Sequence, residues 1–233
     1  MNNTPSQVLI TGTNRGIGLE FVRQYAAAGW RVLACCRDPR SAAVLNGLAS
    51  ASQGSVSVHA LDVADFDQIE RLAATLSGQA IDLLINNAGF YPQGEFGSAD
   101  YAAWDKAFRI NAMAPMKMAE CFVEHVACSR MRKIATLSSK MGSLADNGSG
   151  GSYPYRASKA AANMVMKSLA IDLKPRGIAA ITLHPGWVRT EMGGPNALIE
   201  PERSVAGMRT VMDQLSIHNA GRFVAYDGQE IPW

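Results

Sequence analysis

Short apolar runs alternate with longer segments of helical periodicity along almost the whole chain, and this alternation constrains the fold most strongly. The apolar runs predict strands at Val8–Thr11, Arg31–Cys36, Val56–Ala60, Ile81–Asn86, Lys133–Ser138, Ile178–His184 and Phe223–Tyr226. Helical periodicity predicts helices at Gly16–Ala28, Arg40–Ser50, Asp65–Ser77, Tyr101–Ser129, Tyr155–Lys174 and Pro201–Ile217. Such a series is typical of βαβ units, so we expect an α/β fold: a Rossmann-type doubly wound sheet of seven parallel strands with helices on both faces.

The size of the chain and its lack of linkers indicate one domain. The chain has 233 residues, 48% of them hydrophobic, and no Pro/Ser-rich linker or internal repeat interrupts the series. At roughly 150 residues per domain, we expect residues 1–233 to form a single unit.

Charge and hydropathy exclude several partners. Lys and Arg number 22 and Asp and Glu 20, with no basic run, so a nucleic-acid partner is not expected. The segment Met1–Gln7 lacks the features of a signal peptide, and no stretch reaches the 18 apolar residues of a membrane span. We therefore expect a soluble cytoplasmic protein without a membrane partner.

The four cysteines form no CxxC motif. Cys35 and Cys36 lie in an apolar run and are expected to be small buried side chains. Cys121, His125 and Cys128 lack a fourth zinc ligand, so we expect them on one packed face of a helix, with no metal.

A glycine-rich turn follows the first predicted strand directly. It reads Thr11-Gly12-Thr13-Asn14-Arg15-Gly16-Ile17-Gly18, and helical periodicity begins after it. Glycines at a strand-to-helix turn let the backbone approach a pyrophosphate, and the free N–H groups of the first helical turn bind it. The spacing is GxxxGxG and differs from the GxGxxG of the longer dehydrogenases.

The end of the second predicted strand bears on which dinucleotide binds. An acidic residue at this place holds a ribose diol and excludes a phosphate, but here the strand ends with Cys36, followed by Arg37. Arg15 in the glycine turn is a second cation, so two guanidinium groups are expected to flank a 2′-phosphate. This favours NADP(H) over NAD(H). The alternative is that both arginines are surface residues and Asp38 is the ribose ligand.

Tyr155 and Lys159 lie one turn apart on the same face of a predicted helix. A phenol has a pKa of about 10, and a neighbouring ammonium favours its ionised form, so we expect Lys159 to lower the pKa of Tyr155. Tyr153 is a rival by type, but Ala157 stands four residues after it. Tyr155 is thus the candidate for proton transfer.

Several further motifs follow the glycine turn in a characteristic order. They are Asp62-Val63, Asn86-Asn87-Ala88-Gly89, Asn111, Ser138-Ser139, Tyr155-Arg156-Ala157-Ser158-Lys159 and Pro185-Gly186. In order and separation these motifs resemble the short-chain dehydrogenase/reductase family almost from end to end.

The resemblance implies catalytic roles for four residues. Tyr155 would be the general acid in carbonyl reduction and the base in alcohol oxidation. Lys159 would hold the nicotinamide ribose and depress the pKa of Tyr155. Ser139 would donate a hydrogen bond to the substrate oxygen, where negative charge develops. Asn111 would help to anchor a proton relay through water to Lys159.

The resemblance also implies a set of cofactor contacts. They run from the glycine turn to the segment after the sixth strand. The implied residues are Gly12, Thr13, Asn14, Arg15, Gly16, Ile17, Gly18, Arg37, Asp62, Val63, Asn87, Ala88, Gly89, Tyr155, Lys159, Pro185, Gly186, Val188 and Thr190.

Three of these roles have structural alternatives. Asn111 could cap a kink in a helix that must pass Pro115, and Ser138 is as good a hydroxyl as Ser139 by type. Asp62 could be a helix-start acid, since further aspartates follow it. The glycine-rich segment 146–151 lengthens the gap before Tyr155 and is expected to be a surface loop beside the active site.

Loop segments narrow the resemblance to the subgroup of sniffer-type carbonyl reductases and C-factor-like proteins. These segments are the glycine-rich insertion, residues 184–197 and the ending 226–233. Apolar side chains near the carboxyl ends of the strands are expected to line a substrate pocket, or else to be ordinary loop packing. They are Phe90, Tyr91, Met141, Trp187 and Met192.

The sequence therefore predicts an NADPH-dependent carbonyl reductase acting on an aldehyde, ketone or quinone. The alternative is a dinucleotide-binding signalling or sensor protein of C-factor type, which needs the pocket but not the proton relay. The resemblance makes a homodimer or homotetramer plausible. Met113, Met116 and Met118 either mark such an interface or fill the core.

Overall fold

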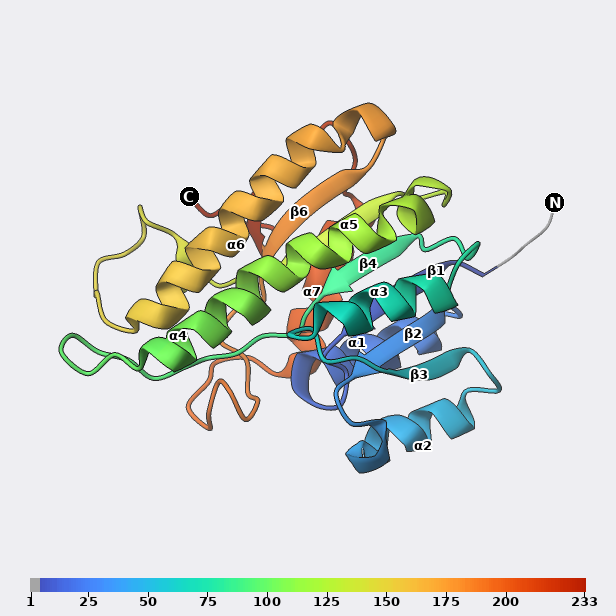
Figure 1. Ribbon diagram of the computed structural model, residues 1–233, viewed down its shortest axis with the longest axis horizontal. Coiled ribbons are helices and arrows are strands. Elements are labelled where there is room, and N and C mark those ends of the chain that lie inside the picture. Colours follow the sequence, from blue (N-terminus) through green and yellow to red (C-terminus); the bar gives the residue numbers. More distant parts are fainter. Residues whose placement is uncertain (1–4) are drawn as a thin grey trace.

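Seven parallel strands form one sheet in the computed structural model, which describes residues 5–233 (Figure 1). The strands are β1 Gln7–Thr11, β2 Arg31–Cys36, β3 Val56–Ala60, β4 Leu83–Asn86, β5 Lys133–Leu137, β6 Ala179–His184 and β7 Phe223–Ala225. Their order is β3-β2-β1-β4-β5-β6-β7, which confirms the predicted fold. Most of the segment Met1–Gln7, where no signal peptide is expected, lies outside the described residues.

The strand order reverses between β1 and β4, and this point determines where a ligand binds. The chain winds outward from β1 in one direction and from β4 in the other, and doubly wound sheets bind their ligands at the carboxyl ends of the two strands at such a point. The glycine turn follows β1 there, and the Asn-Asn-Ala-Gly motif follows β4. All residues of β1, β4 and β5 are buried, as expected of strands covered on both faces.

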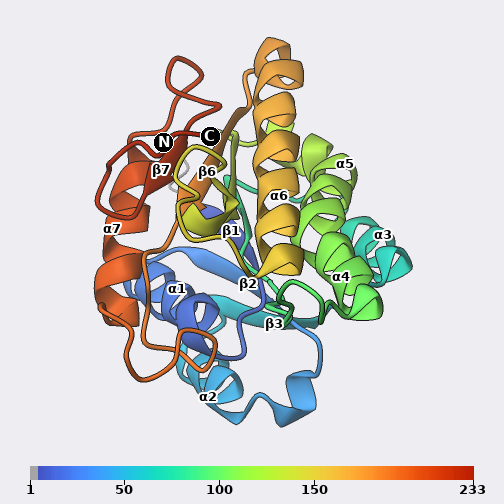
Figure 2. The same cartoon turned by 90° about the vertical axis from the view of Figure 1, so that its left-hand side faces the viewer.

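The longer helices cover both faces of the sheet (Figure 2). Side chains of α1, α2 and α7 pack in the hydrophobic cluster of one face, and side chains of α3, α5 and α6 pack in that of the other. The helices are α1 Gly16–Ala27, α2 Ala43–Ala51, α3 Phe66–Thr75, α4 Tyr101–Phe108, α5 Ala114–Ala127, α6 Tyr153–Asp172 and α7 Pro201–Asp213. Short 3₁₀ turns lie at Pro39–Ser41, Lys140–Gly142 and Lys174–Arg176. No helix among residues 5–233 has both the length and the apolar character needed to span a membrane.

The helix predicted over Tyr101–Ser129 is interrupted. A π-helical turn, Arg109–Met113, separates α4 from α5, so the prediction of one regular helix is wrong. Pro115 explains the interruption, because it has no N–H to donate to the carbonyl four residues earlier and its ring would clash with that carbonyl in a regular helix. That earlier residue is Asn111, which the π turn contains. Such turns are frequent at functional sites.

Other helix boundaries also differ from the prediction. Asp65 precedes α3 as its cap, accepting from the backbone N–H of Gln68 at 3.2 Å. Helix α6 begins two residues early, after Ser152 adopts a left-handed φ of 47°. Helix α6 ends at Asp172, close to the predicted end at Lys174, and Gly177 takes φ 71° after the 3₁₀ turn that follows.

The four cysteines differ in burial, and so do Met113, Met116 and Met118. Cys35 and Cys36 are buried as predicted, but Cys121 is half-buried and Cys128 is exposed, so the fully packed face expected for the second pair is wrong. The reason is position: Cys128 is the C-cap residue of α5, beyond the last packed turn. Met118 fills the core, whereas Met113 and Met116 are exposed.

The buried side chain of Lys133 caps the last turn of α7. Lys133 on β5 donates from its ammonium to the carbonyl oxygens of Met212 at 2.7 Å and Asp213 at 3.0 Å. These carbonyls belong to the last turn of α7 and have no partner within the helix. Burial lowers the pKa of Lys133, while the charge of Asp213 opposes that shift.

We predict that Lys133→Met lowers the free energy of unfolding by about 1–2 kcal/mol, because the carbonyls of Met212 and Asp213 lose the hydrogen bonds from its ammonium. Relief of the buried charge offsets part of the loss. Urea denaturation monitored by circular dichroism checks this, with exposed Lys174→Met as the control. Equal stability of the two variants would show that the cap contributes nothing.

Candidate active site

The glycine turn packs so closely that it requires glycine at two positions. A Cβ on Gly18 would lie 2.1 Å from the carbonyl oxygen of Gly12, and a Cβ on Gly12 would lie 2.9 Å from the Cα of Ala88. No side chain caps the N-terminus of α1, which begins after Arg15. The first-turn N–H groups therefore have no side-chain acceptor, and this fits a bound pyrophosphate.

Asn87 ties the glycine turn to the end of β4. Its side-chain amide donates to the carbonyl oxygens of Thr11 at 2.8 Å and Gly12 at 3.0 Å. In return, the Thr11 hydroxyl accepts from the backbone N–H groups of Asn87 and Ala88, both at 3.0 Å. Thr13 adds a bond from its hydroxyl to the Cys35 carbonyl at 3.0 Å. These bonds hold the two central strands at the bottom of the site.

Arg15 and Arg37 are both exposed at the ends of neighbouring strands. Arg15 forms an ion pair with Glu191 at 2.5 Å. No residue in the described chain pairs with the guanidinium of Arg37. Asp38 caps the following 3₁₀ turn, accepting from the backbone N–H of Arg40 at 3.1 Å, and its pKa is lowered by its hydrogen bonds and by the charge of Arg40, against the opposing effect of burial.

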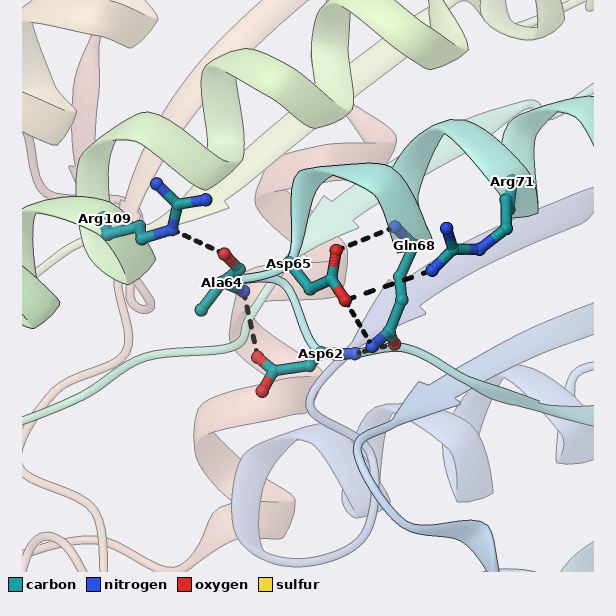
Figure 3. A network of polar contacts seen from close by, with 6 residues as sticks. All are labelled: Asp62, Ala64, Asp65, Gln68, Arg71 and Arg109. Carbon is teal, nitrogen blue, oxygen red and sulfur yellow. Dashed lines mark hydrogen bonds and ion pairs between the residues drawn. The ribbon is translucent and has the colours of Figure 1, made fainter.

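Asp62 lies in a polar network between β3 and α3 (Figure 3). Its carboxylate accepts from the backbone N–H of Ala64 at 2.9 Å, and its own N–H donates to the side chain of Gln68 at 2.9 Å. Asp65, not Asp62, caps α3, so the helix-start alternative for Asp62 is wrong. Arg109 from the π turn donates to the Ala64 carbonyl at 2.5 Å. Beside this network, Val63 is buried.

The π turn presents the Asn111 side chain to α6. The amide donates to the Phe90 carbonyl at 2.8 Å and to the Ser158 hydroxyl at 2.9 Å, and its oxygen accepts from the Phe90 N–H at 2.8 Å. Ser158 in turn donates to the Tyr155 carbonyl at 2.8 Å. The kink-capping alternative is only partly right, because this buried side chain also connects β4 to the helix that carries Tyr155 and Lys159.

Tyr155 and Lys159 are both buried. The Lys159 ammonium donates to the Leu137 carbonyl at 2.8 Å and lies 5.8 Å from the centre of the Tyr155 ring. Gly89 passes beside this pair, since a Cβ on it would lie 3.7 Å from the Lys159 nitrogen and 3.5 Å from the side-chain oxygen of Asn111. The structure thus brings together Tyr155, Lys159 and Asn111, as the sequence predicts.

Burial moves the two pKa values in opposite directions. It raises the pKa of Tyr155 to about 12, while a hydrogen bond with Ser139 opposes the shift and Tyr91 reinforces it. It lowers the pKa of Lys159 to about 8. The pKa of Tyr155 is therefore raised, opposite to the lowering by Lys159 that the sequence predicts. The physical reason is that both groups are desolvated and the ammonium faces a carbonyl.

The geometry distinguishes the two serines after β5. Ser138 is buried and donates to the Lys159 carbonyl at 3.3 Å. Ser139 is half-buried, hydrogen bonds with Tyr155, and accepts from the Met141 N–H at 3.2 Å. The alternative based on Ser138 is therefore disfavoured.

The predicted pocket residues separate into two groups. The Tyr91 ring lies 4.4 Å from the Tyr155 ring, centre to centre, and Trp187 and Met192 are exposed beyond the glycine turn. Met141 is half-buried. Phe90 is half-buried and packs against the hydrophobic cluster under α3, α5 and α6, which agrees with the alternative of ordinary loop packing.

The segment after β6 lies against the glycine turn. A Cβ on Gly16 would lie 3.2 Å from the Thr190 methyl group, and a Cβ on Gly186 would lie 2.5 Å from the Ile199 side chain. The Pro185 carbonyl accepts from Ser204 of α7 at 2.6 Å, and Val188 is buried. Thr190 thus lies beside the glycine turn, while Pro185 and Gly186 contact α7, Ile199 and Tyr226.

Two residues that position the site are not singled out by the sequence. Arg156 donates to Met141, Ser149 and Gly150, so it holds the exposed glycine-rich loop against α6. His184 accepts from the Lys140 N–H at 3.2 Å, next to Ser139, and burial lowers its pKa to about 4. Arg156 follows Tyr155 directly, which is the one sequence signal that points to it.

Comparisons with known proteins agree with this geometry. Residues 6–198 match the family described as short chain dehydrogenase. C-signal of Myxococcus xanthus is 44% identical over 154 residues, which cover 66% of this chain and 93% of that protein. The carbonyl reductase Sniffer of D. melanogaster superposes with a TM-score of 0.91 at 29% identity, covering 99% of this chain and 100% of its own. NADPH-bound carbonyl reductase from chicken fatty liver gives 0.92 at 32%, covering 98% and 99%. The predicted resemblance is confirmed.

We predict that Lys159 makes stability depend on pH. Its pKa is about 8 in the folded chain and near 10.5 when exposed. Between these values the unfolded chain holds a proton that the folded chain has released, so stability rises with pH; below pH 8 the full cost of burying the charge remains. Relative to Lys159→Met, the wild type should gain up to about 3 kcal/mol between pH 7 and pH 10.

Urea denaturation of both proteins at several pH values checks this expectation. The two chains share every other titrating group, so their difference isolates Lys159. A difference that stays constant from pH 7 to pH 10 would contradict the assigned pKa direction.

Proposed function

The chain belongs to the short chain dehydrogenase family, and we propose that it is an NADPH-dependent reductase of aldehyde, ketone or quinone carbonyls. One observation carries the proposal: Tyr155 is buried with the Lys159 ammonium 5.8 Å from its ring centre, and the Ser139 side chain is near enough to lower its pKa against the effect of burial. The carboxyl ends of β1 and β4 lie where doubly wound folds bind their ligands.

Tyr155 is suited to donate a proton. With a pKa raised to about 12 by burial, its hydroxyl stays protonated at neutral pH. Reduction of a carbonyl needs a proton on the product oxygen, whereas oxidation of an alcohol needs a base. A protonated Tyr155 therefore suits the reductive direction.

Three further residues support this proton transfer. Ser139 donates a hydrogen bond to the carbonyl oxygen as negative charge develops on it. Lys159 supplies a positive charge beside Tyr155 that stabilises the phenolate left after the proton departs. Asn111 holds the π turn and α6 in register through its bonds to Phe90 and Ser158, and in that place it anchors a proton relay to Lys159.

The described residues fit NADPH. The tight glycine turn and the uncapped start of α1 accept a pyrophosphate. Arg15 and Arg37 supply exposed cations for a 2′-phosphate, and no carboxylate follows β2 directly, since Cys36 and Arg37 precede Asp38. When bound, NADPH supplies the hydride.

Other implied cofactor contacts lie around the same turn. Their positions follow the carboxyl ends of β3, β4 and β6. They are Asp62 and Val63 for the adenine, Asn87, Ala88 and Gly89 for the adenosine side, and Pro185, Gly186, Val188 and Thr190 for the nicotinamide and its phosphate.

The side chains around the site favour an apolar substrate. Tyr91 contacts Tyr155, and Trp187 and Met192 expose apolar surface on the segment after β6. A small carbonyl compound with apolar substituents gains from burial against such groups.

A second candidate function is dinucleotide sensing without essential turnover. The 44% identity to C-signal of Myxococcus xanthus favours it. A sensor needs the glycine turn but not the proton donor, so loss of the Tyr155 hydroxyl would leave its biological effect unchanged.

We also propose that the protein is cytoplasmic and forms a homodimer or homotetramer. Helices α4, α5 and α6 expose large apolar side chains that a second copy would cover. They are Tyr101, Met113, Met116, Met164 and Ile171.

We predict that Tyr155→Phe lowers kcat for NADPH-dependent carbonyl reduction by at least about 100-fold, because the proton donor is removed. NADPH binding should change little, since the ring remains. Stopped-flow loss of nicotinamide absorbance measures the first effect and fluorescence titration the second. Tyr153→Phe, two residues earlier on the same helix, is the control and should retain activity. Equal activity of both variants would refute the role of Tyr155.

A further inference from the structure

An ion pair joins the glycine turn to the segment after β6. The Arg15 guanidinium contacts the Glu191 carboxylate at 2.5 Å, although the two residues are 176 positions apart in the chain. Both side chains are exposed, at 63% and 72%. The contact lies beside the packing of Thr190 against Gly16, so the two segments meet along their backbones as well.

The segment that carries Glu191 is otherwise held by its own polar contacts. The Trp187 indole donates to the Gly193 carbonyl at 2.7 Å, and Arg189 donates to the Ala197 carbonyl at 2.9 Å. Arg189 also pairs with Glu200 at 2.6 Å. Among the described residues, Glu191 is the one that links this segment to the glycine turn through a side-chain ion pair.

The Glu191 carboxylate thus contacts the Arg15 guanidinium, which the 2′-phosphate of the proposed cofactor would also bind. A 2′-phosphate and a carboxylate are both anions that bind a guanidinium through the same N–H groups. Close approach of both to Arg15 would add like-charge repulsion. NADH lacks the 2′-phosphate and does not compete for this guanidinium.

We propose that Glu191 is a selectivity residue whose carboxylate competes with the 2′-phosphate of NADPH for Arg15, and thereby limits the preference for NADPH over NADH. This inference rests on the proposed NADPH function. An exposed pair contributes little free energy, so a phosphate can displace Glu191 from Arg15. Glu191 therefore reduces the preference for NADPH without abolishing it.

The first test is the pair of dissociation constants of NADPH and NADH for Glu191→Gln, measured by energy transfer from tryptophan to nicotinamide. The neutral amide keeps the shape of the side chain but frees Arg15. We expect the ratio Kd(NADH)/Kd(NADPH) to rise about two- to fivefold, the size of an exposed ion pair. Using the ratio removes any effect of the lost charge on the pyrophosphate, which the two cofactors share.

Two further variants separate competition at Arg15 from a general charge effect. Glu200→Gln removes another exposed carboxylate of the same segment, one paired with Arg189, and should leave the ratio unchanged. In an Arg15→Met background, Glu191→Gln should no longer change the ratio. A change that persists without Arg15, or that Glu200→Gln reproduces, would overturn the proposal.

The outcomes distinguish this inference from the proposed function. If the wild type prefers NADPH and Glu191→Gln does not alter the ratio, the role of Glu191 is wrong and the reductase stands. If the wild type binds NADH as tightly as NADPH, or binds neither, the proposed cofactor is wrong and the role of Glu191 fails with it.

Discussion

The contact between Gly18 and the carbonyl oxygen of Gly12 is the constraint on which the rest of the site depends. Only a residue without a Cβ lets α1 begin this close to the end of β1, since a Cβ would lie 2.1 Å from that oxygen. Asn87 then bonds the same carbonyl from the neighbouring strand. The result is a helix start with free N–H groups at the point where the strand order reverses, and every other site residue is placed relative to it.

Burial, more than charge pairing, controls the chemistry of the Tyr155 and Lys159 pair. Both groups are removed from water, so each favours its neutral form: the pKa of Tyr155 rises and that of Lys159 falls. A protonated phenol beside a hydroxyl donor is the state that carbonyl reduction requires. In the proposed reduction, Lys159, which is still charged below its pKa of about 8, would stabilise the phenolate left on Tyr155.

Much of the fold and the location of the site follow from local sequence. Continuous apolar runs predict the buried strands, and glycine spacing predicts the turn, because both depend on neighbouring residues only. The π turn at Asn111 is harder to predict, since Pro115 permits either a kink or a wider turn and contacts with Phe90 and Ser158 decide between them.

Contacts between residues distant in the chain cannot be predicted from patterns of neighbouring residues. The direction of the Tyr155 pKa shift depends on burial by groups distant in the chain. The Lys133 ammonium donates to the Met212 carbonyl at the end of α7, 79 residues further along the chain. No pattern of neighbouring residues predicts this contact. Phe90 and Tyr91 both follow β4, yet Phe90 packs against the hydrophobic cluster while the Tyr91 ring contacts Tyr155.

The most direct test of the central claim is a fluorescence titration with NADPH and NADH, followed by a panel of aldehydes, ketones and quinones monitored by loss of nicotinamide absorbance. We expect NADPH to bind more tightly than NADH and at least one apolar carbonyl compound to be turned over. Tight NADPH binding without turnover of any of them would contradict the reductase and favour a sensing protein.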